Sequence, residues 1–172
     1  QVLLAAAGGA DSVAEIQALV TAADGAIGYL TTTIQPLTTA PAAGSEGSGE
    51  ISVDDQLAAY SAAGVTGVSA DNLLAVNAQL RLETTAGNKD SVSEIQTIVT
   101  NANTALALIE EYNNGNGDTV LTNTSATDQK VLTKADYEAV GITGVTDANL
   151  VAVNAVILGA SSGGADTVGE IQ

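Results

Sequence analysis

Residues 90–96 read Asp-Ser-Val-Ser-Glu-Ile-Gln, and the same pattern stands at residues 11–17 as DSVAEIQ and at residues 166–172 as DTVGEIQ. In each stretch a Ser or Thr precedes a Glu by three positions, which is the spacing of a capping box. There the hydroxyl accepts from the amide of the third helical residue, and the Glu carboxylate accepts from the amide of the cap. The pattern therefore predicts three helix starts, capped by Ser12, Ser91 and Thr167.

A stripe of apolar residues follows the first two of these stretches. The spacing alternates between three and four residues, which is typical of one face of an amphipathic helix. The stripe consists of Val13, Ile16, Val20, Ala23, Ile27 and Leu30 in the first helix, and of Val92, Ile95, Val99, Ala102, Leu106 and Ile109 in the second. We expect each helix to run for about 20 residues. The first ends near residues 29–34, and the second ends near Tyr112, before the stop signal Asn-Asn-Gly at residues 113–115.

A longer motif occurs twice upstream of these helices. Residues 64–77, GVTGVSADNLLAVN, return as residues 141–154, GITGVTDANLVAVN, which is a shift of 77 positions. The motif opens with a glycine-containing turn and predicts a helix after it, with Ser69 and Thr146 as the caps. The apolar stripe of this middle helix is Leu73, Val76 and Leu80 in one copy and Leu150, Val153 and Ile157 in the other.

A shorter helix is predicted before each turn, at residues 52–63 and 133–140. Ser52 and Thr133 are its candidate caps, and Tyr60 and Tyr137 occupy equivalent places. The sequence thus predicts an all-α fold of tandem three-helix-bundle modules with a period of about 77 residues, joined by Thr-, Gly-, Pro- and Asn-rich linkers. The expected units are a partial module at 1–35, a linker at 36–50, a complete module at 51–112, a linker at 113–129 and a partial module at 130–172.

The two ends of the chain also match each other. Residues 1–17 align without gaps with residues 156–172, and ten of the seventeen pairs are identical. We interpret the chain as a window from a longer tandem array. If separate chains assemble, the third helix at 11–34 of one chain is expected to complete the 127–172 fragment of the next, head to tail.

Composition excludes several classes of function. There are 20 acidic and 4 basic residues, and neither His nor Cys is present. The chain therefore cannot form a Ser-His-Asp triad, a thiolate nucleophile or a Cys-type zinc site. The net charge of −16 argues against nucleic acid as a partner, because phosphate binding needs clustered Lys and Arg. No apolar run reaches the roughly 18 residues that a membrane span requires. We expect neither an enzyme nor a cofactor.

Three groups of polar residues are weighed as sites. Adjacent carboxylates stand at residues 54–55 and 110–111, but neighbours in sequence do not face each other on a helix, so we interpret them as solvated surface groups. Residues 110–118, EEYNNGNGD, gather the oxygen donors that calcium prefers. The candidate calcium ligands are Glu110, Asn113, Asn116 and Asp118. The EF-hand spacing is not met, and a helix end followed by a flexible turn is the alternative interpretation.

Recurring asparagines form the third group. Asn72 matches Asn149, and Asn77 matches Asn154. These amides could face a partner as an interaction surface. Alternatively they hydrogen-bond the turn between helices, which is the commoner use of such residues.

The order of these motifs resembles the GA module, the small three-helix bundle of bacterial surface proteins, some of which bind serum albumin. It is similar above all to GA-like repeats of very large secreted adhesin-type proteins. The motifs that carry the resemblance are YSAAGVTGV at 60–68, the Asn-Leu…Val-Asn pattern at 72–77 and DSVSEIQ at 90–96, with their second copies. Albumin-binding members use the middle helix, which here carries no aromatic residue and no Lys, so albumin binding is not carried over.

The resemblance and the composition together imply a function. We expect a non-enzymatic structural repeat region of a giant extracellular bacterial surface or fibre-forming protein, such as an adhesin stalk. The expected partners are neighbouring repeats or copies of the chain itself. The alternative is a protein-binding module for a host or matrix protein.

Overall fold

The computed structural model describes residues 12–34, 51–114 and 131–172. Regular structure in these ranges is helical throughout, which confirms the predicted all-α class. The elements are α1 (Val13–Tyr29), the π-helical turn η2 (Leu30–Ile34), α2 (Val53–Ala63), α3 (Leu73–Leu82), the 3-10 turn η3 (Ala86–Asn88), α4 (Val92–Asn113), α5 (Lys134–Ala139), α6 (Leu150–Gly159) and α7 (Val168–Ile171).

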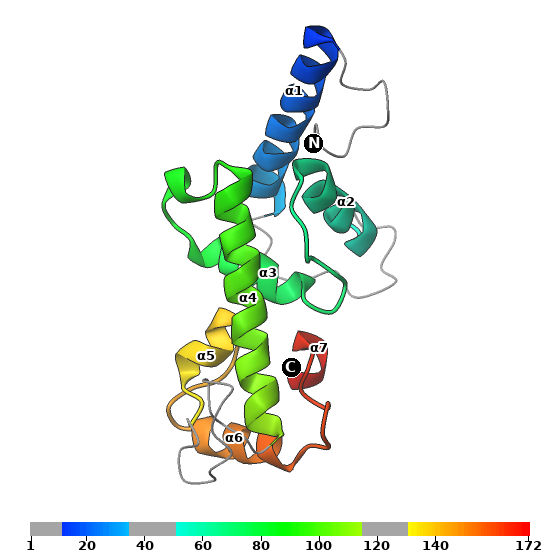
Figure 1. Cartoon of the computed structure of the whole chain (residues 1–172). Helices are drawn as coiled ribbons and strands as arrows, with labels where there is room; N and C mark the ends of the chain where they lie inside the picture. Colours follow the sequence, from blue (N-terminus) through cyan, green and yellow to red (C-terminus); the bar gives the residue numbers. More distant parts are fainter. Residues whose placement is uncertain (1–11, 35–50, 115–130) are drawn as a thin grey trace.

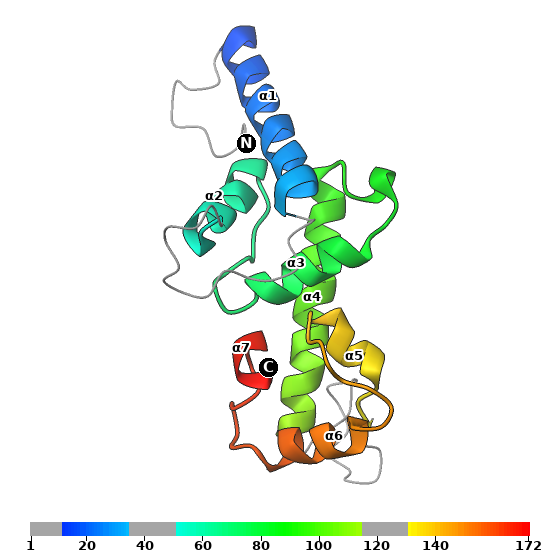
Figure 2. The same ribbon diagram turned by 180° about the vertical axis from the view of Figure 1, so that it is seen from behind.

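The helices form an elongated arrangement rather than one round bundle. α1 and α4 follow one another along the long axis, and the shorter helices lie against them (Figures 1 and 2). α1 packs against α2, whereas α4 packs against α3, α5 and α6. The long helix α4 therefore connects the helices that precede it in the chain with those that follow it.

All three predicted capping boxes are confirmed. The Ser91 Oγ accepts from the Glu94 N–H at 3.3 Å, and the Ser91 N–H donates to the Glu94 carboxylate at 3.0 Å. The same reciprocal pair begins α1 at Ser12 and α7 at Thr167. Each box satisfies two backbone amides that would otherwise lack a partner at the helix start. This explains why a four-residue pattern fixes the position of three helices.

The apolar stripes of α1 and α4 have different surroundings. In α4 the stripe is buried from Ile95 at 0% exposure to Ile109 at 0%, and Val92 before it is half-buried. In α1 only the second half is buried, through Ile27 and Leu30. The first half stays exposed, with Val13 at 83%, Ile16 at 39% and Val20 at 42%. The two stripes are alike in sequence, but among the described residues no helix covers the first half of the α1 stripe.

The first helix of each pair ends as the sequence indicates. Gly64 and Gly141 lie at the C-terminal ends of their helices in the left-handed conformation, with φ of 86° and 85°. The next amide along donates back to the carbonyl of Tyr60 or Tyr137, at 3.0 Å in both cases. Glycine adopts this conformation without a steric penalty, so it ends the helix and turns the chain. Ser52 and Thr133 are the residues at the N-caps of α2 and α5, as predicted.

The predicted start of the middle helix is corrected. α3 begins at Leu73 and α6 at Leu150, so Asn72 and Asn149 are the N-cap residues instead of Ser69 and Thr146. The Leu73 N–H does donate to the Ser69 carbonyl at 3.0 Å. However, the residues between them form a turn, because the Asn72 side chain bonds back to the chain before it rather than forward into the helix.

The predicted module boundaries are tested only in part. The linker at 36–50 lies outside the described residues, as does the linker at 113–129 beyond residue 114. The modular division therefore stays a prediction. In the described part of the chain no helix is long and apolar enough to cross a membrane.

We predict that Ser91→Ala lowers the free energy of unfolding by about 1 kcal/mol, because the Glu94 amide loses its acceptor. Ser93→Ala is the matched control, because Ser93 is exposed two residues later in the first turn of the same helix. Its effect on the free energy of unfolding should stay within about 0.5 kcal/mol. Urea unfolding followed by circular dichroism measures both. Equal effects of the two substitutions would show that the capping box does not stabilise α4.

Candidate interaction surfaces

A buried hydrogen bond joins the first and middle helices of each matching segment. The Tyr60 hydroxyl donates to Asn77 Oδ1 at 2.8 Å, and the Tyr137 hydroxyl donates to Asn154 Oδ1 at 2.6 Å. Both asparagines are nearly inaccessible, at 3% and 5% exposure. The repeated motifs mark the asparagines but do not indicate their pairing with the tyrosines, although the residues of both pairs are 17 positions apart.

The amide groups of these asparagines are also used inside the protein. Asn77 Nδ2 donates to Gln56 Oε1 at 2.7 Å, and Gln56 in turn donates to the Ile51 carbonyl at 3.0 Å. Asn154 Nδ2 donates directly to the Leu132 carbonyl at 2.9 Å. α5 starts later relative to its tyrosine than α2 does, so the backbone takes the place of the Gln56 side chain.

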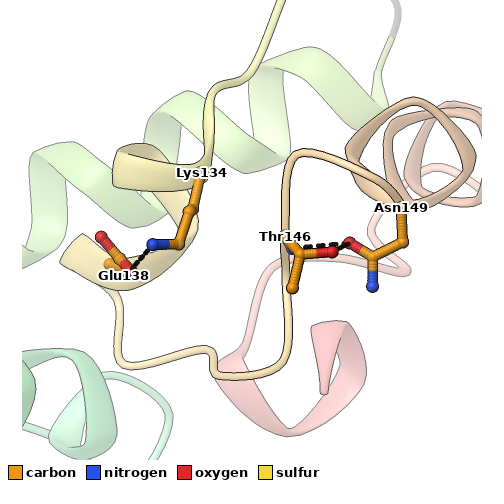
Figure 3. A network of polar contacts seen from close by, with 4 residues as sticks. All are labelled: Lys134, Glu138, Thr146 and Asn149. Atoms are coloured by element: carbon orange, nitrogen blue, oxygen red, sulfur yellow. Dashed lines mark hydrogen bonds and ion pairs between the residues drawn. The ribbon is translucent and has the colours of Figure 1, made fainter.

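Asn72 and Asn149 hold the turn that precedes the middle helix. Asn149 Oδ1 accepts from the Thr146 N–H at 2.6 Å (Figure 3). Its Nδ2 donates to the Gly144 carbonyl at 2.9 Å. Asn72 makes the equivalent bonds to Ser69 and Gly67. In addition, Asn72 Nδ2 donates to Asn103 Oδ1 on α4 at 2.7 Å. Asn149 is exposed, so a role in partner contacts stays a prediction for it.

The calcium candidates are brought together only in part. Glu110 and Asn113 lie in the last turn of α4, whereas Asn116 and Asp118 lie outside the described residues. Asn113 Nδ2 donates to the carbonyls of Ile157 at 2.7 Å and Ala160 at 3.3 Å, which ties α4 to the end of α6. Asn113 Oδ1 is buried without a hydrogen-bond partner. Among the described residues no group of three or more acidic side chains forms a metal site, so calcium binding stays a prediction.

The adjacent carboxylates occupy helix ends. Asp55 accepts from the Ser52 hydroxyl at 2.8 Å at the start of α2, and Asp54 beside it is exposed. Glu110 and Glu111 are half-buried in α4. Negative charge in a first helical turn interacts favourably with the helix dipole, which gives Asp55 a structural role. A surface ion pair, Lys134–Glu138 at 2.9 Å, lies on α5 (Figure 3).

Burial sets the protonation of two tyrosines. It raises the pKa of Tyr137 to about 12 from an ordinary value of 10.0, with smaller contributions from Tyr112 and Asp136. Burial raises the pKa of Tyr60 further, although the charge of Arg81 partly opposes this. Both phenols therefore stay neutral near neutral pH and act as hydrogen-bond donors to their asparagines.

Two apolar helix faces are exposed at opposite ends of the molecule. One is the first half of the α1 stripe, Val13, Ile16 and Val20, which we call the α1 face. The other lies on α6, where Val151 is 81%, Val156 72% and Leu158 42% exposed; together with the exposed Ala152 and Ala155 we call it the α6 face. Figure 1 shows α1 and α6 at the two ends of the long axis. Exposed apolar patches on helices commonly mark interaction sites.

An open groove lies where α3, α4 and α5 meet. It is lined by polar and small residues of α4, from Thr100 to Glu111, together with Gln79 and Ala139. Gln79 Nε2 donates to the Ala139 carbonyl at 2.8 Å across its edge. The groove offers amide, hydroxyl and methyl groups to a partner and a single carboxylate, that of Glu111.

Comparison with known proteins identifies no relative. No family model matches the chain, and neither a curated protein nor a solved structure matches it significantly. The similarity to GA-like repeats therefore stays an expectation from the sequence.

We predict that Asn77→Ala lowers the free energy of unfolding by about 2–4 kcal/mol, because the buried Tyr60 hydroxyl and Gln56 amide both lose their partner. Asn101→Ala, at an exposed position of α4, is the control and should change it by less than about 0.5 kcal/mol. Urea unfolding measures both variants. A loss below about 1 kcal/mol for Asn77→Ala would contradict a stabilising role for this network.

We predict that the chain loses stability between about pH 10 and pH 12. The unfolded chain releases the Tyr137 proton at the ordinary pKa of 10.0, whereas the folded chain keeps it until about 12. Unfolding therefore becomes more favourable as pH rises through this window, and Tyr137 contributes no pH dependence below it. Urea midpoints at stepped pH measure the effect. Tyr137→Phe should reduce the decline, and Tyr60, whose pKa burial also raises, accounts for the remainder. An unchanged decline in that variant would assign the effect to other groups.

Proposed function

We propose that this chain is a non-enzymatic structural repeat region of a large secreted bacterial surface protein, and that it acts there as a spacer or stalk. The observation that carries the proposal is the shared use of α4. It packs on α3 and also on α5 and α6, and the latter two lie along its C-terminal part (Figures 1 and 2). A helix used in this way transmits packing from one repeat to the next.

The junction beyond α4 supports a continuous array rather than separate beads. α3 contacts α5 across the end of the repeat, through the Gln79 bond to the Ala139 carbonyl. Asn113 then fixes the end of α4 to α6. In repeat proteins, neighbour packing of this kind supplies stability that a single small unit lacks.

The composition fits an exposed, extracellular location for such an array. The chain carries a net charge of −16 and no Cys or His, so its repeats repel one another in solution and do not depend on redox state or metal ligation by these residues. The GA-like resemblance of the motifs points to the same class of surface protein.

The alternative function is a binding module for a host or matrix protein. The groove between α3, α4 and α5 favours it, because the groove presents hydrogen-bonding and small apolar groups side by side. Surface plasmon resonance against serum and matrix proteins separates the two functions. A structural spacer is expected to show no specific binding, whereas saturable binding that Thr104→Arg in the groove abolishes would favour the binding module.

The spacer proposal predicts that a break within α4 uncouples its two halves. Thr104→Pro lies at the exposed middle of α4, removes one helical hydrogen bond and costs about 3 kcal/mol or more. We expect the single unfolding transition of residues 51–172 to split in two, with α5 and α6 unfolding separately from α2 and α3. Thr104→Ala is the control and should keep one transition. Two transitions in the unsubstituted chain, by calorimetry or amide exchange, would contradict the proposal.

A further inference from the structure

The packing of α3, α4 and α5 provides a template for contacts that α1 and α6 leave unmade. α4 packs against both α3 and α5, and α5 lies along its C-terminal part (Figure 1). In sequence, α1 corresponds to α4 with a shift of 79 residues, and α6 corresponds to α3 with a shift of 77. α2 corresponds to α5 with the same shift of 77 and already packs on the second half of α1.

The uncovered faces are those that the template covers. Ile16 and Val20 on the α1 face correspond to Ile95 and Val99, which are 0% and 1% exposed beside α3. Ala155 on the α6 face corresponds to Ala78, which is 2% exposed and lies under Gly141 of the α5–α6 turn. Among the described residues, neither face has the neighbour that its sequence equivalent has.

We propose that the α1 face binds α6 of a second copy of this chain, in the arrangement that α4 and α3 adopt within one copy. α2 of the incoming copy then covers the α6 face as α5 covers α3, with Gly64 over Ala155. The contact is heterologous, head to tail, so it leaves one free α1 face and one free α6 face on every assembly. The inference rests on the proposed structural function and names the partner for it.

Two polar pairs in the template fix the register of this contact. Gln96 on α4 exchanges two hydrogen bonds with the backbone of Thr66, both at 3.0 Å. The equivalent residues are Gln17 and Thr143, and both are exposed. In the assembly the Gln17 amide of one copy forms these two hydrogen bonds with the Thr143 backbone of the other. A purely apolar contact would not require them.

The second pair involves Asn149. Its equivalent, Asn72, donates from Nδ2 to Asn103 Oδ1 on α4 at 2.7 Å. The residue on α1 equivalent to Asn103 is Asp24, which is exposed. Asn149 of one copy therefore donates to the Asp24 carboxylate of the other. A carboxylate accepts such a bond more strongly than an amide does. The exposed Asp147, two residues before Asn149, brings a like charge near the pair, which high salt screens.

The chain also contains a competitor for this contact. α7 is the sequence equivalent of the first turn of α4, with a shift of 76 residues. By the same template, α7 competes for the end of α6 that α1 of the second copy approaches. Removal of residues 167–172 is therefore expected to raise the association constant. A lower constant after removal would overturn the proposed register.

Complementation between two variants tests the inference. Ile16→Asp disables the α1 face and Ala155→Asp disables the α6 face, so each variant alone should self-associate at least about tenfold more weakly, because a carboxylate must be desolvated at the contact. Ala18→Asp adds the same charge on the opposite side of α1 and should behave like the unsubstituted chain. A mixture of the two disabled variants should form a 1:1 dimer and nothing larger, since each still offers one intact face.

Analytical ultracentrifugation at 0.15 M and 1 M NaCl measures these outcomes, with stronger association expected at high salt because screening reduces the repulsion between acidic copies. A chain that stays monomeric up to about 1 mM at both salt concentrations would overturn the inference. So would variants that associate normally, or a mixture that forms no dimer. Circular dichroism of each variant separates loss of docking from loss of folding. None of these results alters the coupling within α4 that the Thr104→Pro variant probes.

Discussion

The packing of one long helix against two successive groups of short helices is the constraint on which the rest of the structure depends. The chain has no Phe, Trp or Met, so its core consists mainly of Leu, Ile, Val and Ala. Such side chains bury little area each, and a pair of short helices cannot supply a stable core from them alone. α4 compensates by burying its stripe from Ile95 to Ile109 while it packs against α3, α5 and α6.

Within this thin core a buried polar bond fixes how the first and middle helices meet. Tyr60 and Tyr137 are the largest fully buried side chains, and their hydroxyls reach Asn77 and Asn154. An apolar contact alone would leave two small helices free to slide, whereas an unpaired buried hydroxyl is costly, so the pair selects one register. The same bond forms with different supporting acceptors in the two segments, which shows that the Tyr–Asn pair is the fixed element and its surroundings are variable.

The sequence predicts the positions of helices better than the partners of their faces. Capping boxes and glycine turns act through bonds a few residues apart, so Ser91, Thr167 and Gly64 could be assigned from local pattern alone. The start of α3 was misplaced because Asn72 bonds backwards to the Gly67 carbonyl, a choice between two local structures that spacing does not decide. The sequence does not distinguish the exposure of Ile16 from the burial of Ile95, because the two residues occupy the same position in equivalent stripes. They differ only in what long-range packing brings beside them.

The excess of acidic residues also determines how the helices end. Carboxylates serve at helix starts, where Glu15, Glu94 and Glu170 complete capping boxes beside the positive end of the dipole. With 4 basic residues in the chain, cations can satisfy few of the carbonyls at the other ends. Lys89 does so at the end of α3, where it donates to the Glu83 carbonyl. Elsewhere uncharged groups take this role: the turn after Gly64 bonds back to α2, and the Asn113 amide donates to the last turn of α6. In the case of α6 the donor belongs to a neighbouring helix, so ending one helix also positions the next. An acidic chain of small side chains thereby gains order between its helices from the need to satisfy their C-terminal carbonyls.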